Sequence, residues 1–337
     1  MTVAQSPSRS PNRLPISVLT GFLGSGKTTL LRRVLASPGF ADTAVIVNEF
    51  GSVGLDHLLL EAVEQDVVLL PNGCVCCAVR QDLADTLYRL LRRRDDGLLP
   101  PFRRLALETS GLAEPAPILY TLSADAFLEH TLRLGSVVTT IDSIAGLTTL
   151  DRFQEATMQA ACADRLVLTK TDLAAPPPAL REQLEAINPI ATFIDAADAA
   201  PADILFGHGP AAPPRRRLVA TTAHTHRISA FALRLQRSMT RLAFAMALGG
   251  LARVRGEDLL RVKGLVLFAD DPESPAAIHA VQHTLYPPDW LAAWPDEDHT
   301  SRLVFIVRDI AIEDIMHRFA AGDPVLLDTT TTTSGGD

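Results

Sequence analysis

Cysteine is scarce in this sequence, with four residues among 337. Three of the four nevertheless lie together in the stretch PNGCVCCAVR, at residues 71–80. A disulfide between the adjacent Cys76 and Cys77 would be strained, and structural disulfides are rare in a reducing compartment. Two interpretations of the cluster remain open: buried apolar thiols, or thiolates that bind a soft metal ion.

An excess of positive charge is also missing. The chain has 31 Lys and Arg against 39 Asp and Glu, a formal net charge of -8 at pH 7. This balance provides no general attraction to nucleic acids or anionic membranes, and we expect neither as a partner. No apolar run approaches the ~18 residues that span a bilayer, and the polar N-terminus lacks the apolar segment of a secretory signal. We therefore expect a cytoplasmic protein.

Short apolar runs alternate with amphipathic stretches over residues 14–206. Seven runs have the length and composition of buried strands, at residues 16–20, 43–48, 66–71, 104–109, 136–142, 164–170 and 191–195. The alternation predicts an α/β fold, with an open, mainly parallel sheet and helices on both of its faces. Since 47% of the residues are apolar, the chain can bury a large core, and its length suggests two domains.

The pattern changes once along the chain. Residues 207–225 are rich in Pro and Gly and are predicted to be a linker, followed by a smaller C-terminal α+β domain at 226–328. This domain is expected to form one sheet with helices on one face, from strands at 228–236, 259–268, 276–286 and 301–309 and helices after Thr240 and at 312–320. Residues 1–13 and 329–337 are expected to be flexible tails.

The most specific motif is GFLGSGKTT, at residues 21–29. It follows an apolar run and precedes a helical stretch, which is the setting of a phosphate-binding P-loop. The glycines let backbone N–H groups point into one concavity, while Lys27 reaches the β- and γ-phosphates and Thr28 provides a hydroxyl to Mg²⁺. The expected phosphate-binding residues are Gly21, Gly24, Ser25, Gly26, Lys27, Thr28 and Thr29.

A second nucleotide-site element follows the run at 104–109. Glu108 ends this run, and Gly111 lies three residues later. The carboxylate is expected to hold the Mg²⁺ shell, usually through water, and the N–H of Gly111 to sense the γ-phosphate. The motif E-x-x-G is weak evidence by itself, because many strands end in a carboxylate. It indicates a nucleotide site here because a P-loop precedes it.

The segment TKTD at residues 169–172 is expected to recognise the base. In the usual motif N-K-x-D the aspartate accepts two hydrogen bonds from guanine, which adenine does not offer. Asp172 therefore favours GTP over ATP, and the stem of Lys170 would pack over the purine. Thr169 replaces the usual asparagine, which keeps a hydroxyl but loses the amide.

The cysteine cluster lies where a turn meets a predicted helix. Thiols at a helix N-terminus have lowered pKa values, and Arg80 adds a nearby positive charge, so thiolates are available near neutral pH. Thiolates suit Zn²⁺, Co²⁺ or Cu(I), but three do not complete a tetrahedral zinc shell. A fourth ligand must come from elsewhere, which suits a site that releases its metal. Cys162 is predicted to be an ordinary buried thiol.

Five segments occur in a fixed order: GFLGSGKTT, NEFGSVGLD, NGCVCC, LETSGLAEPAP and TKTD. Together with the C-terminal region they resemble, over residues 14–320, the CobW-like family of P-loop GTPases, a metallochaperone group. The resemblance implies GTP hydrolysis coupled to metal delivery, with Zn²⁺ for most members and Co²⁺ for those linked to cobalamin. It also implies a client metalloprotein that contacts the C-terminal domain and the metal loop, and it leaves a homodimer open.

The same resemblance implies residue roles by matching position. Residues 21–29 would bind phosphates and Mg²⁺, Glu108 and Gly111 would form the hydrolysis-linked switch, and Lys170 with Asp172 would bind guanine. Glu49 lies in the first switch segment, where it would order Mg²⁺, position water or approach the metal. The candidate catalytic residues are Lys27, Glu49 and Glu108, and the candidate metal ligands are Cys74, Cys76 and Cys77, with Thr28 and Glu108 for Mg²⁺.

Two departures from the family pattern stand out. Ser52 follows NEFG where many members have an acidic residue, and few histidines precede the C-terminal domain, namely His208, His224 and His226. A metal-storage role is therefore unsupported. His279 and His283, four apart on a predicted strand, would face the same side, and we interpret them as packing or partner-contact residues.

These observations predict a GTP-hydrolysing metallochaperone that binds Zn²⁺ or a similar ion at the CxCC motif and delivers it to client proteins. Three alternatives remain. The first is a cobalt-directed protein of cobalamin synthesis, and the second is a regulatory GTP-binding module that senses metal or redox state. The third, a P-loop small-molecule kinase, is weakened by TKTD and by the lack of an evident acceptor site.

Overall fold

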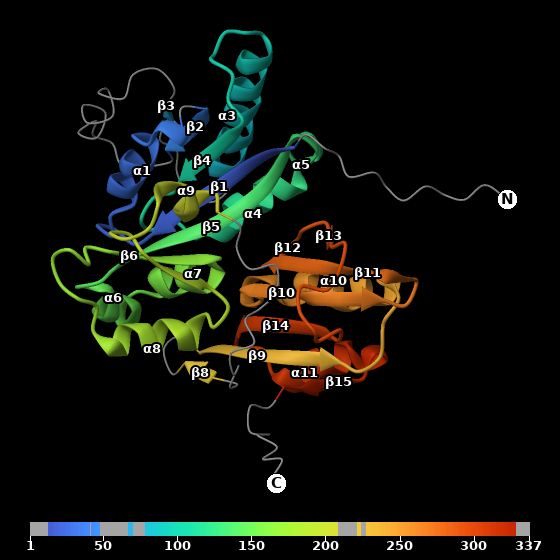
Figure 1. Cartoon of the computed structure of the whole chain (residues 1–337). Helices are drawn as coiled ribbons and strands as arrows, with labels where there is room; N and C mark the ends of the chain where they lie inside the picture. Colours follow the sequence, from blue (N-terminus) through green and yellow to red (C-terminus); the bar gives the residue numbers. More distant parts are fainter. Residues whose placement is uncertain are drawn as a thin grey trace.

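The computed structural model describes residues 13–40, 42–47, 67–69, 78–207, 221–223 and 227–327. These residues form two sheets, each with its own helices (Figure 1). The first sheet belongs to the N-terminal part of the chain and carries the P-loop, and the second belongs to the C-terminal part.

The first sheet has seven strands in the order β3-β2-β4-β1-β5-β6-β7. Their bounds are β1 (Leu14–Gly21), β2 (Thr43–Val47), β3 (Val67–Leu69), β4 (Arg104–Glu108), β5 (Leu132–Asp142), β6 (Arg165–Thr169) and β7 (Thr192–Asp195). Every neighbouring pair is parallel. The predicted parallel α/β sheet is therefore confirmed. Because β4 lies between β1 and β2, the loop after β1 opens at a point where the strand order reverses, a usual place for ligands in such sheets.

Helices cover both faces of this sheet, as predicted. One face packs against α1 (Lys27–Leu35) and α9 (Pro201–Leu205), with Leu19, Val45 and Val138 pointing toward them. The other face is covered by α3 (Ala78–Asp95), α4 (Pro115–Ala124), α5 (Ala126–Thr131), α6 (Gly146–Arg152), α7 (Gln154–Cys162) and α8 (Pro178–Ile187). Consecutive strand residues point to opposite faces, so continuous apolar runs such as 44–47 fill both cores.

The second sheet is antiparallel and has the order β12-β11-β10-β14-β9-β15. Its strands are β9 (Ile228–Leu235), β10 (Arg261–Phe268), β11 (Asp271–Val281), β12 (Thr284–Leu285), β14 (Ser301–Arg308) and β15 (Pro324–Leu326), with β8 (Thr221–Ala223) beside β9 and β13 (Asp289–Trp290) beside β11. Short 3₁₀ turns lie at Pro38–Phe40, Gly256–Asp258 and Ala320–Gly322. The smaller C-terminal α+β unit is thus confirmed, although β8 lies inside the predicted linker.

Two helices pack on one face of the second sheet, α10 (Arg241–Arg255) and α11 (Ile312–Arg318). Thr240 caps α10, since its hydroxyl accepts a hydrogen bond from the N–H of Ala243 at 3.2 Å. Beneath these helices the buried ring of Phe305 contacts the rings of Phe231 and Phe319. The opposite face of the sheet packs on α7 and α8 of the first unit, so the two units share a buried core.

One strand prediction is wrong. The stretch 276–286 is a hairpin, in which β11 ends at Val281 and β12 folds back onto it. Gln282 takes a positive φ of 51° in the two-residue turn. His279 and His283 therefore do not face the same side of one strand: His279 lies on β11, while His283 lies in the turn and contacts the carbonyl oxygen of Ala252 at 2.8 Å.

Among the helices of these described ranges, none combines the length and the apolar character needed to cross a bilayer.

Candidate functional site

The P-loop connects β1 to α1 at the carboxyl end of the first sheet. It closes as a turn in which the N–H of Ser25 donates to the carbonyl of Phe22 at 3.1 Å. Gly26 then adopts a left-handed conformation with φ of 90° and precedes the first residue of α1, Lys27. This is a conformation that glycine adopts without strain. The loop therefore leads directly into a helix N-terminus, where unpaired N–H groups favour phosphate.

The side chain of Ser25 points toward the sheet and holds the loop there, so it does not enter the concavity of the P-loop. Its hydroxyl lies 2.6 Å from the hydroxyl of Thr140 on β5, and both side chains are buried. Thr140 donates in turn to the carbonyl of Thr20 at 3.2 Å, so Ser25 is the donor in the first bond. Ser25 thus offers only its backbone to a phosphate.

Lys27 is 9% exposed and bends back over the loop. Its Nζ donates to the carbonyls of Gly21 at 2.9 Å and Phe22 at 3.1 Å. These bonds keep the ammonium at the mouth of the P-loop, which is where it is needed to offset phosphate charge.

Thr28 and Glu108 meet across the same site, although 80 positions separate them in the sequence. The Thr28 hydroxyl donates to Glu108 Oε1 at 2.6 Å. Hard oxygen ligands of this kind, a hydroxyl beside a carboxylate, suit Mg²⁺. Their donor chemistry therefore fits the predicted Mg²⁺ site, with Thr28 as ligand and Glu108 beside it.

Gly111 lies against the P-loop, and an added Cβ would come within 2.8 Å of the backbone nitrogen of Leu23. The segment after Glu108 therefore approaches the loop at a distance that only glycine allows. It is held in place by Gln159 of α7, whose amide donates to the carbonyls of Gly111 at 3.1 Å and Ala113 at 3.0 Å. The predicted γ-phosphate sensor is thus connected directly to a helix that packs on the C-terminal unit.

The TKTD segment follows β6 and adjoins the P-loop. The Thr169 hydroxyl donates to the carbonyl of Ser25 at 2.7 Å, so it fastens the base segment to the phosphate loop despite replacing asparagine. Lys170, with φ of 60°, places its Nζ 2.5 Å from Asp142 Oδ2. Asp172 is exposed. Its carboxylate is accessible at the position expected for a guanine acceptor.

Asp142 is the last residue of β5, and its carboxylate holds the side chain of Lys170. Burial opposes its ionisation, but the hydrogen bond from Lys170 and the N–H groups of Ala145 and Ile144 together hold the pKa of Asp142 below its usual value. Asp142 is therefore a carboxylate at neutral pH and sets the position of the Lys170 side chain.

Several predicted site residues lie outside the described ranges, namely Glu49, Ser52, Cys74, Cys76, Cys77, His208, His224 and His226. The predicted metal site therefore stays a prediction. Within the ranges that are described, no group of three or more His, Cys, Asp or Glu side chains is placed to hold a metal ion. Cys162 is a buried free thiol, as predicted, and burial raises its pKa to about 12.

Three site residues were missed in the sequence: Thr140, Asp142 and Gln159. Asp142 carried a usable signal, because it ends an apolar run as Glu108 does. Thr140 and Gln159 carried none, since each is a common residue within a strand or helix whose partner comes from a distant segment.

Two family models match this chain. The CobW/HypB/UreG nucleotide-binding domain matches residues 15–195, and the cobalamin synthesis protein cobW C-terminal domain matches residues 228–322. The chain belongs to the CobW/HypB/UreG family. The resemblance stated from the five sequence segments is thereby confirmed; the first match spans the strands of the first sheet, and the second match spans most of those of the second.

Several relatives of this CobW/HypB/UreG protein carry zinc in their names. The zinc chaperone YjiA of Escherichia coli is 33% identical over 319 residues, which cover 92% of this chain and 98% of YjiA. Zinc-regulated GTPase metalloprotein activator 1 of Schizosaccharomyces pombe is 36% identical over 168 residues, covering 48% of this chain but 39% of that protein. Among solved structures, Zn(II)-bound YjiA GTPase from E. coli superposes with a TM-score of 0.67 at 27% identity, covering 92% of this chain and 99% of that chain.

Proposed function

We propose that this protein is a GTP-hydrolysing metallochaperone that carries Zn²⁺ and delivers it to a client metalloprotein. The observation that carries the proposal is the meeting of Thr28 and Glu108 at the mouth of the P-loop, 2.6 Å apart. P-loop proteins that hydrolyse nucleotides use this arrangement, in which a hydroxyl of the P-loop lies beside a carboxylate at the end of a neighbouring strand. The zinc part of the proposal is supported by the full-length similarity to the zinc chaperone YjiA.

Each residue of the site has a separate role in nucleotide binding or hydrolysis. The P-loop N–H groups and Lys27 bind and orient the phosphates, and Asp172 selects guanine. Bound Mg²⁺ would be held by Thr28, with Glu108 in its outer shell, and would neutralise phosphate charge. The Gly111 N–H responds to the γ-phosphate, and Glu49, in the first switch segment, orders Mg²⁺, positions water or approaches the metal.

Zinc is the cargo of this mechanism. Cys74, Cys76 and Cys77 bind it as thiolates, and the incomplete shell permits release to a client. Because the cluster works in its reduced form, the proposal places the protein in the cytoplasm. Co²⁺ is the alternative cargo, and a homodimer is a further expectation that sedimentation velocity would test.

Helix α7 would pass a conformational change from the nucleotide site to the unit that contacts the client. Gln159 of this helix holds the carbonyls of Gly111 and Ala113, and the far end of α7 meets the C-terminal unit, where Arg261 donates to the carbonyl of Cys162 at 3.1 Å. A shift of the Gly111 segment on hydrolysis would therefore act on the face that supports the C-terminal unit. In this proposal the C-terminal unit and the metal loop together contact the client.

Zinc release tests this function without a known client. The protein is loaded with Zn²⁺ and Mg²⁺·GTP, and transfer to a fluorescent zinc chelator is followed during a single turnover. We expect release to accelerate with hydrolysis in the wild type and not in Lys27→Ala, which lacks the ammonium that offsets phosphate charge. Equal release from both proteins would contradict delivery driven by GTP, and would favour a metal sensor.

A further inference from the structure

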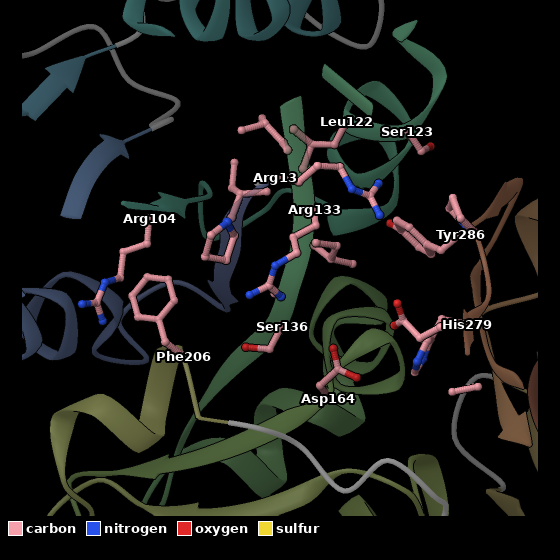
Figure 2. Close-up of a pocket in the computed structure, with 18 of the residues that line it drawn as sticks. Arg13, Arg104, Leu122, Ser123, Arg133, Ser136, Asp164, Phe206, His279 and Tyr286 are labelled. Atoms are coloured by element: carbon pink, nitrogen blue, oxygen red, sulfur yellow. The ribbon is translucent and has the colours of Figure 1, made fainter. Parts of the chain in front are cut away.

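A large cavity lies between the two units, away from the nucleotide site (Figure 2). Its volume is about 570 Å³, and its walls include the amino ends of β1, β4 and β5 and parts of β10 and β11. The P-loop lies at the opposite, carboxyl end of β1. Since a strand rises ~3.3 Å per residue, the two sites are on the order of 20 Å apart. The cavity is therefore separate from the GTP site.

The charge of the cavity wall is opposite to that of the protein. Six Arg or Lys side chains line it against four Asp or Glu, a surplus of two positive charges. The whole chain has a formal net charge of -8. A local positive field of this kind attracts anions.

The innermost wall holds a buried charge cluster contributed by both units. Asp164, just before β6, forms ion pairs with Arg261 and with Lys263, the latter at 3.4 Å. Beside them, burial and the charges of Lys263 and Arg261 lower the pKa of His279 to about 3, so its imidazole is neutral at pH 7. Two cations thus face one carboxylate, which leaves one positive charge without a counter-ion from this cluster.

Two further groups provide hydrogen-bond donors. The Tyr286 hydroxyl is buried and has no hydrogen-bond partner in the described part of the chain, and its side chain points into the cavity toward β5 (Figure 2). Arg133 of β5 also lines the cavity; its side chain is exposed, extends from the strand toward Ser136 (Figure 2), and forms no ion pair or hydrogen bond with a described residue. A buried hydroxyl without a partner is costly, so a site of this kind is suited to an acceptor group from a ligand.

Part of the remaining wall is apolar, beside polar and charged side chains such as Ser123, Ser136 and Glu129. Leu122, Leu132, Phe206 and Pro287 contribute to the apolar part. Apolar walls with a few directed polar groups are typical of small-molecule sites. We propose that this cavity binds a small organic anion, whose carboxylate or phosphate group lies between Arg133 and Tyr286 and whose apolar body packs on these walls. Because the ligand contacts both units, it stabilises their arrangement.

Binding is measured by isothermal titration calorimetry on the full chain saturated with GDP and Mg²⁺, so that the P-loop takes up no probe. The organic anions are phenyl phosphate and benzoate, and the controls are inorganic phosphate and benzyl alcohol. We expect at least one organic anion to bind more tightly than both controls, and the tighter of the two identifies the anionic group. Binding of benzyl alcohol as tight as that of the anions would overturn the proposal.

Two variants locate the site. Arg133→Gln and Tyr286→Phe should each weaken binding of the organic anion by about tenfold, because each removes one donor to a charged acceptor. Arg237→Gln, an exposed change elsewhere on the C-terminal unit, should leave it unchanged. Tyr286→Phe should not lower the melting temperature, since the hydroxyl bonds to no described residue and its burial is costly. Wild-type affinity in both variants would overturn the assignment, whatever their stability.

Discussion

Thr169 stands where the guanine motif N-K-x-D has asparagine, and its side chain contacts the P-loop directly. Asparagine at this position in the guanine motif would provide an amide, whereas Thr169 provides a hydroxyl that reaches the carbonyl of Ser25 at 2.7 Å. The bond joins the TKTD segment to the P-loop, the two segments that are predicted to bind the base and the phosphates.

Removing this hydroxyl should weaken nucleotide binding. Thr169→Val keeps the shape of the side chain but leaves the buried carbonyl of Ser25 without its donor. We expect the dissociation constant of GDP to rise about tenfold, equivalent to ~1.4 kcal/mol. A fluorescent GDP titration measures the change, with Thr169→Ser as the matched control that keeps the hydroxyl. Wild-type affinity in Thr169→Val would show that the bond does not support the site.

At the scale of elements, α7 connects the Gly111 segment, the predicted γ-phosphate sensor, to the second unit. Its middle residue Gln159 is fully buried and holds the Gly111 segment, and its end packs on the C-terminal sheet. Because one helix contacts both parts, we predict that a change at one end is passed to the other.

Gln159→Leu tests this connection. The change keeps the apolar packing of α7 but leaves the carbonyls of Gly111 and Ala113 without the amide donor. We expect faster deuterium uptake at residues 110–113 by hydrogen-exchange mass spectrometry, because the segment loses its two anchors. Gln183→Leu on α8 is the control, since that side chain contacts Asp151 instead. Unchanged uptake in Gln159→Leu would argue against α7 as the connection.

The elements that the sequence predicted best are those with an unambiguous pattern. Buried parallel strands are continuous apolar runs, so all seven strands of the first sheet were found. The β11–β12 hairpin was not, because its turn residues Gln282 and His283 belong to types that rarely mark a turn. In the site, the P-loop, Glu108 and TKTD stand out by spacing, whereas Ser25–Thr140 and Gln159–Gly111 depend on contacts between distant segments.

At the scale of the whole molecule, the junction between the units contains the charge cluster of Asp164, Arg261, Lys263 and His279. The neutral imidazole there makes stability depend on pH. The pKa of His279 is about 3 in the folded protein and near 6.5 when unfolded, so between these values only the unfolded chain takes up the proton. Stability therefore falls as the pH drops through this window.

His279→Gln should remove this part of the pH dependence. Between pH 7 and pH 5 the wild type is expected to lose ~2 kcal/mol of unfolding free energy through this histidine, a loss that the variant avoids. Asp164 does not contribute in this range, because its lowered pKa keeps it ionised in the folded state and its unfolded pKa is near 3.9. Urea unfolding at both pH values measures the difference. An equal loss in both proteins would place the titrating group elsewhere.

The central claim is that the nucleotide state and metal binding are coupled. Coupling of this kind is reciprocal and typically amounts to ~1–3 kcal/mol, or roughly 5- to 150-fold in affinity. The measurement is a calorimetric titration of Zn²⁺ into protein bound to a non-hydrolysable GTP analogue and into protein bound to GDP, with free nucleotide removed. A double Ser substitution at Cys76 and Cys77 serves as the matched control, because a neutral hydroxyl replaces a soft thiolate.

In the wild type, we predict zinc affinities that differ at least fivefold between the two nucleotide states, consistent with the typical range of coupling. In the double variant, zinc binding should be weak in both states while GDP binding stays at the wild-type level. Equal zinc affinities in the GTP-analogue and GDP states of the wild type would contradict the coupled metallochaperone, even if the cysteines bind the metal.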